Sequence, residues 1–185
     1  MQQLSFISKV RGFLILGILI PMLSFNLPQQ SSISFEHQVK AVYLYNFAQF
    51  IEWPEKTFTQ SDDPIILGIL GKDPFGNFLE ETVKDEVVNG HPIVVQRYSS
   101  VNEIKACHIL FIHPSVNSRM DNILKGLTGR NILTVSDANN FTKLGGMVRF
   151  VKDANKIKLH VKLNKVKDEG ISISSKLLRL SEIVD

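Results

Sequence analysis

The sequence predicts an α/β fold: a three-layer sandwich with a mostly parallel central sheet, an antiparallel edge hairpin and helices on both faces. Three observations predict it. Short apolar runs alternate with helical segments from residue 65 to 135, which is the pattern of βαβ units. Strict alternation of apolar and basic residues at 156–163 (KIKLHVKL) indicates a half-buried strand. The chain has 185 residues, 44% of them apolar and 21% charged, which suits one cored domain.

Composition and charge exclude several other classes of protein. A single cysteine can form neither an intrachain disulfide nor a zinc site with several thiolates. The chain has 21 basic and 18 acidic residues, but Lys9 and Arg11 belong to the leading segment described next. Without those two, 19 basic residues face 18 acidic ones, so we expect no nucleic-acid partner.

Residues 1–34 have the features of an export signal followed by a linker. Lys9 and Arg11 precede an apolar run at 12–25 (GFLILGILIPMLSF), and residues 1–11 contain no acidic side chain. As a helix the run would be roughly 21 Å long, short of the roughly 30 Å hydrocarbon core. We therefore expect a signal peptide, with an uncleaved membrane anchor as the alternative because no Ala-x-Ala pattern follows. Residues 35–185 are then one exported domain.

The domain opens with a helix that we expect to run from Phe35 to Trp53, where Pro54 ends it. Two apolar stripes with helical spacing lie side by side on it: Tyr43, Phe47 and Phe50; and Leu44, Ala48 and Ile51. An arc this wide predicts burial against a sheet, or in part against a second protomer, which leaves a homodimer open.

Two βαβ units follow. In the first, the strand at 65–70 (IILGIL) leads to an expected N-cap at Asp73, a helix at 75–86 and a strand at 93–95. In the second, the strand at 109–112 leads to an expected cap at Ser115, a helix to about residue 127 and a strand at 131–135. The runs at 147–151 and 157–163 form the predicted edge hairpin, in which lysines protect the exposed face. We expect a C-terminal helix at 174–184.

The carboxyl ends of the predicted strands carry polar residues that could form a site, including His113, Ser136 and Asp137. Capping of the following helices explains Asp73, Ser115 and Asp137 better than catalysis does. The five histidines lack the spacing of metal ligands, and no nucleotide-binding glycine motif is present. Cys107 precedes a buried strand without a basic neighbour, which predicts an inert, partly buried thiol. We expect no catalytic residues, no metal and no cofactor.

Several short blocks, taken in order, resemble the YfiR family of periplasmic regulators over roughly residues 38–184. The blocks are 40–47 (KAVYLYNF), 52–54 (EWP), 67–71 (LGILG), 73–76 (DPFG), 107–112 (CHILFI), 133–137 (LTVSD), Phe141 with 145–147 (GGM), 163–164 (LN) and 173–178 (ISSKLL). Two departures stand out: Cys107 is alone, so disulfides found in some members cannot form, and 166–168 (VKD) replaces a helix that is usually rich in small residues.

The resemblance implies a protein without catalytic activity that binds the periplasmic part of an inner-membrane diguanylate cyclase and represses it. The protein would thereby control cyclic-di-GMP signalling and biofilm formation. The alternative from a different class is a periplasmic sensor that binds a small ligand. As partner-binding residues we expect two aromatic residues of the opening helix and a glycine-containing loop: Tyr43, Phe50, Phe141, Gly145, Gly146 and Met147. The loop is a candidate because Phe141 and Met147 flank a Gly pair at a sheet end. In the competing interpretation both of these side chains tuck inward.

Overall fold

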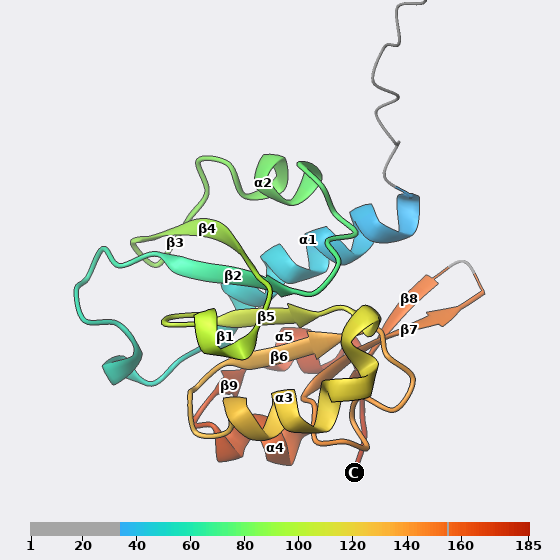
Figure 1. Ribbon diagram of the computed structural model, residues 1–185. Helices are drawn as coiled ribbons and strands as arrows, with labels where there is room; N and C mark the ends of the chain where they lie inside the picture. Colours follow the sequence, from blue (N-terminus) through green and yellow to red (C-terminus); the bar gives the residue numbers. More distant parts are fainter. Residues whose placement is uncertain (1–33, 155) are drawn as a thin grey trace, which may run out of the picture. The chain divides into compact units, whose positions relative to one another are not determined.

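A computed structural model describes residues 34–154 and 156–185 (Figure 1). The predicted signal segment lies outside these residues apart from Ser34. Within the described residues, eight strands form one sheet in the order β10-β8-β7-β6-β5-β2-β4-β3. They are β2 (Ile65–Leu70), β3 (Val87–Val88), β4 (His91–Tyr98), β5 (Ile109–Ile112), β6 (Leu133–Ser136), β7 (Val148–Asp153), β8 (Lys156–Val161) and β10 (Ser181–Ile183). A separate pair joins β1 (Ile51–Glu52) to β9 (Ser172–Ile173).

The pairing within the sheet confirms the predicted mixture of strand directions. Strands β4, β2, β5, β6 and β7 are parallel neighbours, whereas β7 and β8 form an antiparallel hairpin. Leu159 and Val161 of β8 are buried while Lys156 and Lys158 are exposed, as the alternation indicated. The hairpin lies one strand in from the edge, because β10 pairs in parallel with β8.

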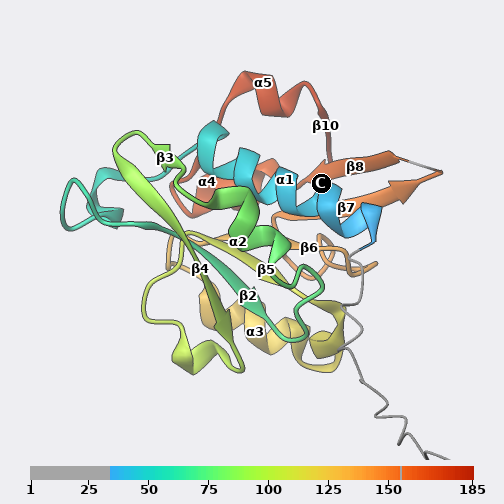
Figure 2. The same ribbon diagram turned by 90° about the horizontal axis from the view of Figure 1, so that it is seen from above.

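Helices cover both faces of the sheet, which confirms the three-layer prediction (Figure 2). Helices α1 (Phe35–Phe50), α2 (Phe78–Val83), α4 (Leu163–Asp168) and α5 (Ser175–Leu178) pack on one face, and α3 (Met120–Leu127) packs on the other. Adjacent residues of β5 divide between the faces: Ile109 and Phe111 lie in the core under α1, and Leu110 and Ile112 in the core under α3. No helix among the described residues is long and apolar enough to cross a membrane.

Helix α1 begins where the sequence predicts and ends three residues earlier than expected. The Ser34 hydroxyl caps it by accepting a hydrogen bond from the main-chain N–H of His37. After Phe50 the chain turns extended, and Ile51 pairs with Ile173 of β9. The prediction of a helix up to Trp53 was wrong because this strand pairing satisfies the backbone before Pro54 is reached.

In both βαβ units the helix starts later than predicted, and the predicted N-cap residues Asp73 and Ser115 make other contacts. Asp73 accepts a hydrogen bond from the N–H of Phe75 at 2.7 Å and so holds a turn, and α2 starts later, after Asn77. The segment after β5 opens as a 3-10 helix, Pro114–Arg119, before α3, and its N-cap is the imidazole of His113. Ser115 instead accepts a hydrogen bond from the N–H of Lys72 and ties the two strand ends together.

The C-terminal helix predicted for 174–184 is wrong in extent. Helix α5 has four residues, and the chain then runs along the outer edge of β8 as β10, with Ser181 beside Leu159 and Ile183 beside Val161. Pairing with a free strand edge satisfies backbone groups that a surface helix would satisfy internally, and a local sequence pattern does not record that choice.

Candidate functional site

Helix α1 carries apolar side chains around much of its circumference. Its inner side is buried against the sheet, with Ala41, Leu44, Phe47 and Ala48 all at most 1% exposed. The Phe47 ring stacks on that of Phe150 in β7, with 6.1 Å between ring centroids. The core interpretation of this helix is therefore correct for one of its two sides.

The other side of α1 presents apolar residues to solvent. Phe35 is 75% exposed and Val42 is 43% exposed, and their spacing of two helical turns puts them on the same side. Leu180, which follows α5 and is 69% exposed, lies beside them and helps to line a groove of about 490 Å³. We call this patch the α1 surface; its apolar residues are Phe35, Val39, Val42, Tyr43, Phe78 and Leu180.

A second and larger cavity, of about 820 Å³, adjoins the amino end of α1. The hairpin strands contribute Lys152, Lys156 and Ile157 to its lining, and Phe35 and Tyr43 line it as well as the groove. This volume lies within the range of small-molecule sites. Because both hollows share Phe35 and Tyr43, the α1 surface directly adjoins the cavity beside the β7–β8 hairpin.

A buried ion-pair network holds the first half of α1 against the sheet. The Lys40 side chain is 3% exposed, and its Nζ lies 2.6 Å from Glu36 Oε1 and 2.7 Å from Asp137 Oδ2 at the carboxyl end of β6. Lys152 of β7 binds the other oxygen of Glu36 at 2.8 Å. The hydrogen bond from Lys152, and after it that from Lys40, lowers the pKa of Glu36 from 4.5 to about 2.

The polar residues at the strand ends are engaged in turns and caps. Ser136 Oγ donates a hydrogen bond to the Ile112 carbonyl at 2.6 Å and accepts one from the Ala138 N–H. His113 Nδ1 accepts from the Ser115 N–H at 3.0 Å, and burial lowers the pKa of this imidazole. Asp137 is held by Lys40. The prediction that Asp137 caps a following helix was wrong, because β6 leads into a turn-rich loop rather than a helix and the carboxylate binds Lys40 instead. All of these contacts are structural ones, and they favour a structural role for these residues over a nucleophile with its base.

Cys107 has the environment that the sequence predicts. Its side chain is buried, its Sγ donates to the Ile109 carbonyl at 3.3 Å, and burial raises the pKa of the thiol to about 12. A thiol of this kind stays protonated and unreactive at neutral pH.

The structure separates the predicted partner-binding residues into three places. Tyr43 lies on the α1 surface, with its ring against Phe47 and Phe150. Phe50 lies half-buried at the far end of α1, where its carbonyl accepts a hydrogen bond from the Ser174 N–H. The remaining four residues lie in the loop between β6 and β7.

That loop directs its large side chains inward. Phe141 is 0% exposed and Met147 is 5% exposed, so the inward alternative describes both residues. Gly146 is explained by packing, because a Cβ there would lie 2.3 Å from the Phe141 ring. Gly145 has φ +99° and borders, with Leu144, a hollow of about 350 Å³. Only Leu144, at 43% exposure, presents a large apolar group to solvent in this loop.

Sequence reasoning did not select Phe35, Val42 or Leu180 as site residues. For Phe35 and Val42 a signal was present, because they are spaced by seven residues on a helix whose opposite side already supplies the core. Leu180 carried none, since its position depends on the path of the chain into β10.

An α/β domain whose strand-end polar groups are engaged in turns, and whose first helix presents an apolar side to solvent, has the features of a binding protein. A family model described as YfiR/HmsC-like matches residues 37–182, which is most of the chain, and the chain belongs to this family. The family consists of periplasmic regulators, so the resemblance seen in the sequence is confirmed. No curated protein matches the chain significantly.

Proposed function

We propose that the protein is exported to the periplasm, where it binds the periplasmic part of an inner-membrane diguanylate cyclase through the α1 surface and represses it. The observation that supports this most is the exposure of Phe35, Val42 and Leu180 on one continuous patch. Contiguous exposed apolar groups cost solubility and usually mark an interaction site. Membership in a family of regulators supports the same function.

Repression by binding requires a preference for one state of the cyclase. A regulator that binds the inactive conformation roughly 10⁴-fold more tightly moves the equilibrium from about 1:99 to about 99:1. Apolar side chains at the centre of an interface supply such differences when the matching pocket exists in only one conformation. In the proposed complex, Phe35, Val42 and Leu180 all contact the cyclase.

The test compares two surface variants with a matched control. Val42→Glu and Leu180→Glu each place a charge on the α1 surface, whereas Val87→Glu places one at Val87 of β3, an apolar residue that is 59% exposed and outside this surface. Tagged proteins are recovered from the periplasm and mixed with solubilised inner membranes. Membrane proteins that stay bound are eluted away from the tagged protein, and the released fraction, now free of the repressor, is assayed for conversion of GTP to cyclic-di-GMP.

We expect both α1-surface variants to lose the bound cyclase by at least tenfold and to raise cellular cyclic-di-GMP and biofilm, while Val87→Glu behaves as wild type. Melting temperatures within a few degrees of wild type show that folding is intact. Full retention of the cyclase by both α1-surface variants would exclude this surface as the binding site.

A periplasmic sensor for a small ligand is the second candidate, and the 820 Å³ cavity favours it. Tyr43 and Ile157 supply apolar walls there, Lys156 supplies a positive charge, and Lys152 is paired with Glu36, which also lines the cavity. The cavity therefore suits a small ligand that has an apolar body and a polar end. Native mass spectrometry of the protein purified from the periplasm distinguishes the two functions. A retained small molecule that is lost in Tyr43→Ala supports the sensor.

A further inference from the structure

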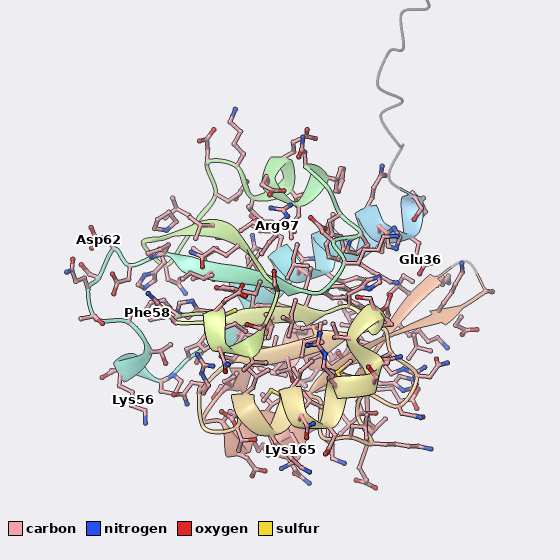
Figure 3. The ribbon with its side chains drawn as sticks, in the orientation of Figure 1. Glu36, Lys56, Phe58, Asp62, Arg97 and Lys165 are labelled. Carbon is pink, nitrogen blue, oxygen red and sulfur yellow. The ribbon has the colours of Figure 1, made fainter. Side chains whose placement is uncertain are left out.

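A segment at the amino ends of the parallel strands is held by stacked rings. Residues 53–64 connect β1 to β2 and project beyond the sheet, where Figure 3 labels Lys56, Phe58 and Asp62. The Phe58 ring turns back onto the domain and lies between two imidazoles. It stacks on His91 with 4.0 Å between ring centroids and on His108 with 4.7 Å, at interplanar angles of 20° and 11°.

Two further contacts complete the cluster. The indole of Trp53 meets the His108 ring edge-on, with 5.7 Å between centroids. His91 Nδ1 lies 2.7 Å from the main-chain carbonyl of Asp63, so the segment is tied down at both of its ends. We call the four rings of Trp53, Phe58, His91 and His108 the latch.

The two histidines face opposite kinds of hydrogen-bonding group. His91 Nδ1 faces a carbonyl, which accepts, so this nitrogen carries hydrogen. His108 Nδ1 lies 2.9 Å from the Ile66 N–H, which donates, so this nitrogen has to be unprotonated in the folded protein. A proton on His108 Nδ1 would oppose that N–H and place a charge on a side chain that is 5% exposed.

The charged neighbours of His108 act in opposite directions. Burial is the largest influence on its pKa, the charge of His91 adds to it, and Asp63 acts against both. Together they lower the pKa of His108 from 6.5 to about 4. The Trp53 Nε1 is buried without a hydrogen-bond partner among the described residues, which further weakens the closed position.

We propose that the latch is a pH-sensitive switch: protonation of His108 breaks its hydrogen bond to the Ile66 N–H and releases residues 53–64 from the end of the sheet. The closed form binds fewer protons than the open form, so closure is strongest above pH 6.5 and weakens as the pH falls toward 4. Over that interval the equilibrium constant for closing the latch falls by roughly tenfold per pH unit. The switch is a property of the isolated protein and does not depend on the proposed cyclase partner.

Trp53 is the only tryptophan of the chain and reports on the latch directly. Opening moves the indole from the ring cluster into water, so its emission shifts to longer wavelength. We expect a reversible shift between pH 6.5 and 3.5 without a change in far-ultraviolet circular dichroism. The imidazole ¹⁵N signals of uniformly labelled protein should show His108 as the Nε2–H tautomer at pH 7 and titrating together with the Trp53 emission.

The variant His108→Asn tests the cause. The asparagine Oδ1 accepts from the Ile66 N–H much as Nδ1 does but does not titrate, so the acid shift should disappear. His160→Gln, at a histidine on β8 that pairs with Glu182, is the matched control and should keep the wild-type shift.

Three results would overturn the proposal. They are a His108 that becomes protonated in the labelled wild type without any change in Trp53 emission, an acid shift that persists in folded His108→Asn, and an emission change that coincides with loss of the circular dichroism signal. Because the first and third use the wild type, the test stands even where the variant does not fold.

Discussion

Replacement of Lys40 tests whether the buried ion pairs hold α1 in place. Lys40→Met keeps most of the side-chain volume but removes the charge that binds Asp137, whose Oδ1 is already buried without a partner among the described residues. Removal of one partner from a fully buried pair costs about 3–5 kcal/mol. Asp137 is 21% exposed, so water offsets part of the loss and we expect about 3 kcal/mol.

The assay is urea unfolding at pH 7, with unfolding free energies compared across a double-mutant cycle. Asp137→Asn combined with Lys40→Met leaves no unpaired charge at β6, so the double variant should be more stable than Lys40→Met alone. Lys152→Met is the control. It removes a lysine that is 65% exposed from the same Glu36 and should cost about 0–1 kcal/mol. If Lys40→Met costs no more than Lys152→Met, the ion pairs of Lys40 do not stabilise the packing of α1 and the reasoning is refuted.

Three further predictions concern packing and acid stability. Gly68→Ala should destabilise the domain by about 1–3 kcal/mol in thermal unfolding, because the new Cβ would lie 2.8 Å from Cys107 Sγ; an unchanged melting temperature would contradict this packing. Phe141→Ala should lower the unfolding free energy by about 3–5 kcal/mol and make Gly146→Ala less harmful by opening space, whereas a surface role for Phe141 requires a stability close to wild type. The unfolded chain takes up a proton at Glu36 near pH 4.5 but the folded protein only near pH 2, so the ionised carboxylate stabilises the fold above pH 4.5 and this contribution is lost as the pH falls through 2. Glu36→Gln should therefore reduce the slope of unfolding free energy against pH between 4.5 and 2, measured by urea unfolding. A slope equal to that of the wild type would count against this prediction.

The sequence alone predicted the elements whose signals are local. The strand at 65–70 was placed with its observed bounds because a continuous apolar run between turn residues describes a strand buried on both faces. The hairpin of β7 and β8 followed from alternating apolar and basic residues, which record one buried and one exposed face. Cys107 was recognised as inert because the same pattern placed it beside a buried strand.

Tertiary structure alone decided the features that depend on residues far apart in the chain. Lys40 meets Asp137 across 97 positions, and no spacing in the sequence indicates that pair. The inward turn of Phe141 depended on the space left by Gly146, and the outward position of Leu180 on the free edge of β8 that β10 occupies. The α1 surface also depends on tertiary structure. The sequence shows that α1 is apolar on most sides, but only packing against the sheet determines which side of the helix is buried and which side is exposed to solvent. Local patterns record burial and backbone preference, whereas the choice among alternative partners is made by the free energy of the whole fold.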